Sequence, residues 1–202
     1  MSPVRTNLAL MELSQTSPHL TVAADGSAVT DDGLVVKHVL HAERINTTNE
    51  ARVDARFVSW QICRLVRRDF NYVATKSFHK GAGKSKVRTK EQLRELMTDI
   101  RLQAEFFLDD VSGFPVNPVP NVRVVPLRLF SDFVGGLLRS MMIADKAYDR
   151  LNHAFEQGQV SEEDYRAYSR NFELSWSAIK AFLNNGQSDK SAQELGAAQG
   201  IA

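Results

Sequence analysis

Several features are scarce in this 202-residue chain, and each absence narrows the classes of protein to which it can belong. The single cysteine, Cys63, excludes an internal disulfide framework and a cysteine-based zinc site. No apolar run reaches the roughly 18 residues that a bilayer-spanning helix needs. Lysine and arginine number 25 against 24 aspartates and glutamates, so neither sign of charge dominates. We therefore expect a cytoplasmic protein without membrane contact, whose one thiol lies buried in the core.

The sequence also lacks the motifs of the common catalytic classes. Gly-x-Ser-x-Gly, the dinucleotide fingerprint and the two-histidine metalloprotease motif are absent, and GAGKSK does not have the spacing of a P-loop. Of the histidines, only His38 and His41 are close in sequence, and on an extended run they would point to opposite faces. Cys63 as a nucleophile has only arginine-rich neighbours to support it. We predict no enzymatic activity, no catalytic residues, no metal site and no cofactor.

Hydrophobic periodicity predicts an α+β, mainly helical domain over residues 21–183. A flexible N-terminal segment, 1–20, precedes it, and a disordered tail, 184–202, follows it. Two β-favouring runs, 20–24 and 34–40, are separated by Asp-Gly turn signals and predict a small antiparallel piece. Helical spacing of apolar residues predicts four helices, over residues 50–70, 89–111, 131–155 and 161–182.

The segment 75–90 has the most one-sided charge, with several lysines and arginines and no acidic residue around Gly81-Ala82-Gly83. This composition is typical of a mobile basic loop. Cations that neutralise phosphates release condensed counterions and give salt-sensitive affinity for nucleic acid. A solvated loop without a ligand is the alternative interpretation. The candidate phosphate-binding residues are Lys80, Lys84, Lys86, Arg88 and Lys90.

A short strand followed at once by a capped helix occupies residues 121–157. Ser131 stands at the N-cap position, and Asp132 adds a negative charge at the positive end of the helix dipole. Gly135-Gly136 inside this helix indicates either a close helix–helix crossing or a break between two shorter helices. Along the strand, an apolar set (Val125, Leu127, Leu129) alternates with a mixed set (Val124, Pro126, Arg128).

Three stretches together resemble an AcaB-like family of transcriptional activators carried by conjugative plasmids and integrating conjugative elements. They are LVVKHVLHAERI, DFVGGLLRSMMIADKAYDRL and the aromatic SEEDYRAYSRNFELSWSAIKAF near the C-terminus. The resemblance implies a bacterial, sequence-specific double-stranded DNA-binding activator of conjugative transfer genes. It implies a homodimer, with RNA polymerase as a further candidate partner. It also implies a ribbon-helix-helix-like DNA-binding element embedded in the helical domain, with a β-ribbon in the major groove.

Carried onto this sequence, the resemblance places the DNA contacts on the predicted strand and the start of its helix. Arg128 would read guanine, because its guanidinium matches O6 and N7. Ser131 would clamp a phosphate, and Val124 would face the bases beside Pro126. Pro126 removes a ladder donor and Arg123 shares the parity of the apolar set, so we expect a bulge or a different register. The alternative is a strand that pairs within its own subunit and merely exposes Arg128. The candidate DNA-contacting residues are Arg123, Val124, Arg128 and Ser131.

Two other functions stay open from the residues alone. The first is a non-enzymatic helical interaction protein of the conjugation machinery, with the aromatic last helix as its partner surface. The second is a single-strand nucleic-acid-binding accessory factor, in which Tyr72 or Phe78 stacks on bases. A core packing role for the same aromatic residues competes with both.

Overall fold

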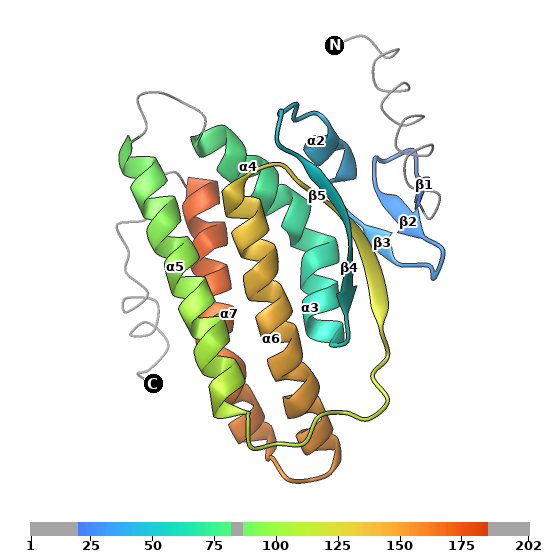
Figure 1. Ribbon diagram of the computed structural model, residues 1–202, viewed down its shortest axis with the longest axis vertical. Helices are drawn as coiled ribbons and strands as arrows, with labels where there is room; N and C mark the ends of the chain where they lie inside the picture. Colours follow the sequence, from blue (N-terminus) through green and yellow to red (C-terminus); the bar gives the residue numbers. More distant parts are fainter. Residues whose placement is uncertain (1–19, 82–86, 186–202) are drawn as a thin grey trace.

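The computed structural model describes residues 20–81 and 87–185, which form an α+β domain that is mostly helical (Figure 1). The predicted flexible segment 1–20 and the predicted tail 184–202 lie almost wholly outside the described residues, as do Lys84 and Lys86. In chain order the elements are β1 (Leu20–Val22), β2 (Ala28–Thr30), β3 (Val35–Val36), α2 (Val39–Glu43), β4 (Ala51–Phe57), α3 (Trp60–Leu65), the π-helical turn η1 (Val66–Phe70), α4 (Asn71–Gly81), α5 (Val87–Asp110), β5 (Arg123–Leu129), α6 (Asp132–Glu156) and α7 (Glu162–Asn185).

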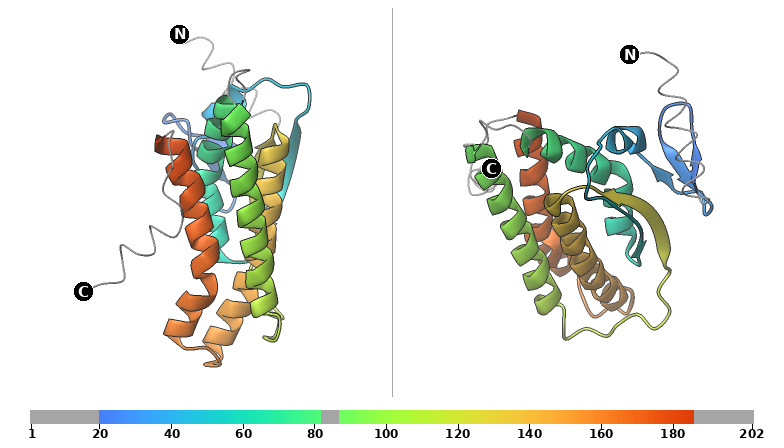
Figure 2. Two further views of the ribbon diagram at one scale, coloured as in Figure 1. Left: turned by 90° about the vertical axis from the view of Figure 1, so that its left-hand side faces the viewer. Right: turned by 45° about the horizontal axis from the view of Figure 1, so that its top comes forward.

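Three long helices, α5, α6 and α7, lie side by side and pack on the continuous helical segment formed by α3, η1 and α4 (Figures 1 and 2). The predicted aromatic stripe of α7 supplies much of the core, and its Phe172, Trp176 and Phe182 are buried. The three predicted helices after residue 87 are confirmed, although α5 begins two residues earlier than Thr89. Within residues 20–81 and 87–185, no helix is both long and apolar enough to cross a membrane.

The prediction of one helix over residues 50–70 is wrong. Residues 51–57 form the strand β4, and helix begins only at Trp60, where the Ser59 hydroxyl accepts a hydrogen bond from the backbone N–H of Ile62 at 3.3 Å. The same stretch that fits helical spacing also alternates in polarity, with Val53 and Ala55 between charged neighbours and Phe57 after Arg56. Pairing along the whole of β5 decides between the two patterns, because it satisfies the backbone groups with which the two strands face each other.

The prediction of a mobile basic loop over residues 75–90 is also wrong for the part of it that the structure describes. Residues 75–81 belong to α4, and residues 87–90 belong to α5. Helix α4 forms because Val73, Ala74 and Ser77 share one buried face. Lys76 and Lys80 are consequently held on a helix, where their positions are fixed relative to the helices below.

The predicted antiparallel piece is confirmed as the three-stranded sheet β1-β2-β3. Its turns use Gly26 and Gly33 at φ of 80° and 79°, a conformation that favours glycine. The strand β3 is shorter than the predicted run 34–40, because His38 adopts φ 60° and turns the chain into α2. The rings of His38 and His41 therefore lie 5.5 Å apart and do not point to opposite faces as predicted.

The strands β4 and β5 form a second, two-stranded antiparallel sheet that packs on α3 and α6. Its register runs without interruption from Ala51 opposite Leu129 to Phe57 opposite Arg123, so the expected bulge is absent from this pair. Pro126 is tolerated because both strands of a two-stranded sheet are edge strands. The chain thus forms its own β-ribbon, which is the intrachain alternative considered for this strand.

Helix α6 runs unbroken through Gly135-Gly136. A Cβ added at Gly136 would lie 3.0 Å from the Met97 sulfur, whereas one at Gly135 would meet only the Arg139 guanidinium at 4.0 Å. Gly136 therefore permits the close crossing of α6 with α5, which is one of the two alternatives predicted for the pair. The Ser131 N-cap is confirmed, since its hydroxyl accepts from the Val134 N–H at 3.3 Å.

Candidate nucleic-acid interface

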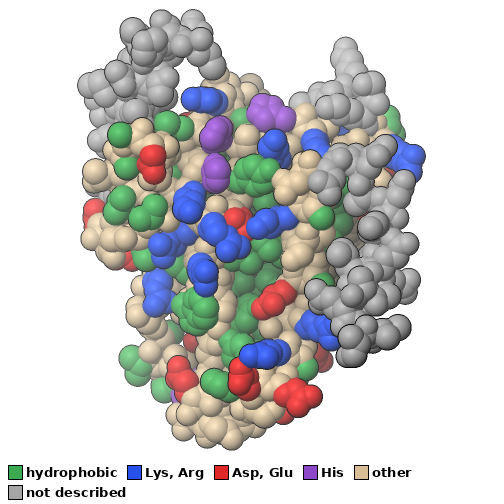
Figure 3. Space-filling view, turned by 180° about the vertical axis from the view of Figure 1, so that it is seen from behind, with side chains coloured by type: hydrophobic (Ala, Val, Ile, Leu, Met, Phe, Trp, Pro, Cys, Tyr) green, Lys and Arg blue, Asp and Glu red, His purple; other side chains and the backbone are tan. Residues whose placement is uncertain are grey.

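A continuous helical segment, residues 60–81, concentrates positive charge on one side of the molecule. It has five lysines and arginines and a single acidic residue, Asp69. Lys37 follows β3, which is docked on η1, and Lys180 of α7 reaches the same segment. Figure 3 shows lysine, arginine and histidine side chains gathered over the upper part of this face. We call the following set the cationic face: Lys37, Arg64, Arg67, Arg68, Lys76, Lys80 and Lys180.

Hydrogen bonds between separate elements hold the cationic face in place. The Arg67 Nε–H donates to the Val35 carbonyl at 3.1 Å, and the Lys37 N–H donates to the Arg67 carbonyl at 2.8 Å. The Asn71 side-chain amide donates to the Lys37 carbonyl at 3.0 Å. Strand β3 is therefore tied to the helical segment on both sides of Val36, and the face is preformed.

The one carboxylate of the segment is neutralised internally. Asp69 is buried and accepts hydrogen bonds from Arg68 at 2.9 and 2.8 Å and from the Lys180 ammonium at 2.7 Å. Burial raises the pKa of Asp69, but the hydrogen bonds from Arg68 and Lys180 outweigh it and leave this pKa below its usual value. Two cations thus surround one carboxylate, and the local excess of positive charge remains.

Aromatic side chains lie among the cations. Trp60 is 53% exposed, and the Arg64 guanidinium carbon lies 5.9 Å from its ring centroid. The Lys76 ammonium lies 5.7 Å from the centroid of the Tyr72 ring. These contacts orient long, otherwise mobile side chains over aromatic surface, which lowers the entropy lost when they bind an anion.

Negative charge collects at the other end of the molecule. Glu162, Glu163 and Asp164 occupy the first turn of α7, and Asp109 and Asp110 end α5. These two helix ends lie together at the foot of the domain in Figure 1, and Figure 3 shows acidic side chains there. Arg166 is ion-paired with Glu162 at this end, and the remaining carboxylates leave it more acidic than the cationic face.

The structure corrects the role predicted for Arg128. Its side chain is only 7% exposed, so its guanidinium does not face a ligand. It donates to the Ala42 carbonyl at 2.7 Å and is paired with the carboxylates of Glu50 and Glu43, the latter at 3.9 Å. The Arg128 guanidinium is enclosed by α2 and Glu50. It is therefore neither presented to a base, as the resemblance implies, nor exposed to solvent, as the intrachain alternative assumed.

The two other DNA-contact candidates on β5, Val124 and Arg123, differ in their exposure. Val124 is exposed beside Arg56 on the outer side of the ribbon, whereas Arg123 is half-buried. The charges of Arg123 and Arg67 act on Cys63, but burial of this thiol dominates and raises its pKa. Cys63 is 1% exposed, which confirms the predicted buried thiol and removes the support for a nucleophile.

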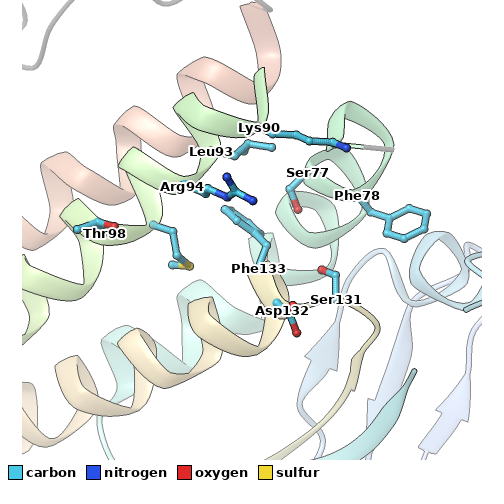
Figure 4. A pocket seen from close by; sticks show the side chains of 11 residues that line it. Ser77, Phe78, Lys90, Leu93, Arg94, Thr98, Ser131, Asp132 and Phe133 are labelled. Carbon is cyan, nitrogen blue, oxygen red and sulfur yellow. The ribbon is translucent and has the colours of Figure 1, made fainter. Parts of the chain in front are cut away.

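Ser131 and Lys90 both line a separate pocket of about 680 Å³ between α4, α5 and the start of α6 (Figure 4). Lys90 and Arg94 of α5 line it together with Asp132, over an apolar lining that includes Phe133. The Ser131 hydroxyl is engaged as the α6 cap, and Asp132 brings a negative charge to the same rim. The pocket is therefore less suited to a phosphate chain than the cationic face.

Of the three predicted phosphate-binding residues that the structure describes, Lys80, Arg88 and Lys90, Lys80 is the one that belongs to the cationic face. Its ammonium donates to the Phe182 carbonyl at 2.7 Å and lies 4.9 Å from the Phe182 ring centroid. Arg88 is exposed on α5. The arginines of the face, Arg64, Arg67 and Arg68, were not among the predicted contacts, although the sequence signals them through the one-sided charge of residues 60–81.

Comparison with known proteins gives a structural match without a sequence match. No family model matches the chain, and neither does any curated protein. The fold is similar to the crystal structure of selenomethionine-containing AcaB from uropathogenic E. coli, with a TM-score of 0.52. The match covers 68% of this chain and 78% of the AcaB chain, at 11% sequence identity. At this identity the similarity concerns the fold alone.

Proposed function

We propose that this protein is a double-stranded DNA-binding transcriptional regulator of conjugative transfer genes, which acts as a homodimer. The observation that carries the proposal is the cationic face, a preformed surface on the helical segment 60–81. The AcaB-like fold and the resemblance of the sequence to AcaB-like activators support the same class of function. In this proposal RNA polymerase is the partner of an activator bound at its promoter.

The cationic face replaces the ribbon as the proposed phosphate-contacting surface. Exposed cations such as Arg64, Arg68 and Lys76 are spread along one helical segment, where several can reach successive phosphates of one strand. The outer side of the ribbon offers less, because Arg56 lies near Asp54 and Arg128 is enclosed. The acidic foot of the domain would keep that end away from the duplex and so orient the protein on DNA.

The proposal is tested by measuring fluorescence anisotropy of a labelled duplex over a range of salt concentrations. Wild-type protein should show a log–log salt dependence with a steep negative slope. Arg64→Gln and Lys76→Gln should each weaken binding to all duplexes alike and make the slope shallower by about 1 for each phosphate that is no longer neutralised. These two side chains are chosen because the contacts described for them are with aromatic rings, so their removal leaves the ion pairs of Asp69 intact.

Two matched controls locate the surface. Arg139→Gln removes an exposed cation of α6 outside the cationic face, and Arg56→Gln removes an exposed cation of the ribbon. Neither should change the slope. A slope that falls with Arg56→Gln and not with Arg64→Gln would return the interface to the ribbon, and a duplex that does not bind at low salt would refute the function. Light scattering of the free and DNA-bound protein measures the homodimer directly.

A further inference from the structure

A hollow of about 330 Å³ opens on the cationic face between α3, α6 and α7. Its size is at the small end of the range for ligand pockets and fits one nucleotide. Both tryptophans of the chain, Trp60 and Trp176, line it. Arg64, Arg68 and Glu173 bring charged groups to the same lining.

Trp60 provides an exposed aromatic surface at the edge of this hollow. A 53% exposed tryptophan is unusual on a folded domain, and apart from the Arg64 guanidinium much of its ring remains in solvent. Indole rings stack on nucleobases of any kind, with a contribution of about 1–3 kcal/mol per base. The position of Trp60 beside two arginines is therefore suited to a ligand that has both a flat ring and a phosphate.

Trp176 contributes a polar group without a partner. Its side chain is 4% exposed, and its Nε1–H has no hydrogen-bond acceptor among residues 20–81 and 87–185. Such an orphaned donor costs stability, because the indole loses its hydrogen bond to water without a replacement. Trp176 lines the hollow, but its Nε1 is covered in the free protein, so a ring nitrogen or a carbonyl oxygen of a ligand supplies the missing acceptor when the indole turns toward it.

Glu173 adds the complementary group. Its Oε1 accepts a hydrogen bond from the Tyr148 hydroxyl at 2.7 Å, which holds the exposed carboxylate at the pocket. A carboxylate accepts from an exocyclic amino group of a base but repels a carbonyl oxygen. Such a carboxylate favours a base with an amino group, such as cytosine, over one with a carbonyl oxygen at the same position, such as uracil.

We propose that this hollow binds a single nucleotide whose base carries an amino group. The base stacks on Trp60, its amino group donates to Glu173, and an acceptor on its edge receives the Trp176 N–H. The phosphate is bound by Arg64 and by the part of the Arg68 guanidinium that does not donate to Asp69, and the two arginines are four residues apart on the helical segment. The inference rests on the proposed function in placing nucleic-acid chemistry on this face. The nucleotide is either a free effector or an unpaired base of a DNA strand.

Intrinsic tryptophan fluorescence tests the proposal directly, since both tryptophans of the chain line the hollow. Deoxycytidine monophosphate should quench the emission with a saturable curve, and deoxyuridine monophosphate should bind about tenfold more weakly or worse. Short oligomers of deoxycytidine and deoxyuridine form the second arm. Saturation by the free nucleotide identifies an effector, and saturation only by the oligomer identifies an unpaired base in a strand.

Variants measured by calorimetry assign the roles. Because Glu173 is exposed, the Glu173→Gln variant should fold normally. It should lose the preference for cytosine over uracil. Trp176→Phe keeps an aromatic ring but lacks the N–H, and it should weaken binding about three- to tenfold. Trp60→Ala should weaken it about tenfold or more. Arg139→Gln, outside the hollow, should leave nucleotide affinity unchanged.

The outcomes separate this inference from the proposed function. Salt-dependent duplex binding without any saturable quenching by nucleotide or oligomer overturns the pocket and leaves the regulator proposal standing. Saturable, cytosine-selective quenching without duplex binding supports the pocket and refutes the regulator. Equal quenching by both nucleotides that Glu173→Gln does not alter overturns the assignment of Glu173 and with it the amino-bearing base.

Discussion

The guanidinium of Arg128 in β5 is paired with the carboxylate of Glu50, just before β4, although the strand was expected to present this arginine to DNA. The same guanidinium donates to the Ala42 carbonyl in α2 and lies 3.9 Å from Glu43. One side chain thus joins α2, the start of β4 and the end of β5. Arg128 therefore ties the ribbon to α2, and its guanidinium is enclosed in this structure.

Replacing Arg128 by Met is expected to lower the free energy of unfolding by about 3 kcal/mol. Removing one partner of a buried ion pair costs about 3–5 kcal/mol, and the partial exposure of Glu50 puts the cost at the low end. Urea denaturation measures the loss. Arg56→Met, an exposed position of the same ribbon, should change stability by no more than about 0.5 kcal/mol. A fully stable Arg128→Met protein with altered DNA sequence preference would restore the base-reading role.

The Arg128–Glu50 pair also predicts a pH dependence. The hydrogen bond from Arg128 lowers the pKa of Glu50 below its ordinary value of 4.5. A depressed carboxyl pKa contributes stability above the unfolded value, and the contribution disappears as pH falls through the folded pKa. The stability difference between wild type and Glu50→Gln should therefore be constant near neutral pH and shrink below about pH 4.5. A difference that is the same at pH 3 and pH 7, about four pH units apart, would contradict the ion pair.

The sequence predicted the helices that pack on one another and failed where pairing across the chain decides the structure. α5, α6 and α7 each have a long apolar stripe of helical period, and the three were predicted nearly to their ends. Residues 51–57 fit both the helical spacing and the two-residue alternation of a strand. Only their pairing with β5, some 70 positions later, makes them a strand. The helical residues 75–81 were hidden by their lysines, because charge counting ignores the buried face of Val73, Ala74 and Ser77.

The candidate site was predictable in kind but not in place. One-sided charge pointed to a polyanion, yet the lysines singled out are divided among α4, α5 and residues outside the described part of the chain. The alternation of residues along a strand predicts on which side of the ribbon Arg128 lies, but it does not predict whether another element covers that side. At the Arg128 end of the ribbon, α2 covers it. The pocket with Trp60 and Trp176 could not be found at all from the sequence, since its walls lie more than 100 residues apart.

Gly135 and Gly136 should respond differently to the same substitution. Gly135→Ala adds a methyl group with no heavy atom nearer than 4.0 Å, so the higher helix propensity of alanine should stabilise the protein by about 0.5–1 kcal/mol. Gly136→Ala places a Cβ 3.0 Å from the Met97 sulfur, so the crossing with α5 must open or Met97 must shift. We expect Gly136→Ala to be less stable than Gly135→Ala by at least about 1 kcal/mol in thermal unfolding. Equal stabilisation by both would show that α5 and α6 are not in close contact at this point.

Asp145 of α6 secures the corner where β4 turns into α3. Its carboxylate accepts hydrogen bonds from the Val58 N–H at 2.9 Å, the Ser59 N–H at 2.9 Å and the Ser59 hydroxyl at 2.6 Å. Burial raises the pKa of Asp145 against the opposing effect of these hydrogen bonds. A raised pKa means that this carboxyl favours folding most below its unfolded value of 3.8 and that the advantage is lost as pH rises through the folded pKa.

A double-mutant cycle isolates this contact. Asp145→Ala leaves three donors without an acceptor in the interior and should cost about 3 kcal/mol or more. Ser59→Ala removes only the hydroxyl and should cost about 1–2 kcal/mol, including its role as the α3 cap. Because the two side chains are hydrogen-bonded, the double variant should lose less than the sum of the single losses, by about 1 kcal/mol. Strict additivity in urea denaturation would show that the Ser59 hydroxyl is not coupled to Asp145. The corner before α3, which positions Trp60 and Arg64, would then depend on the two backbone N–H bonds to Asp145 and on the Gln61–Asn152 hydrogen bonds.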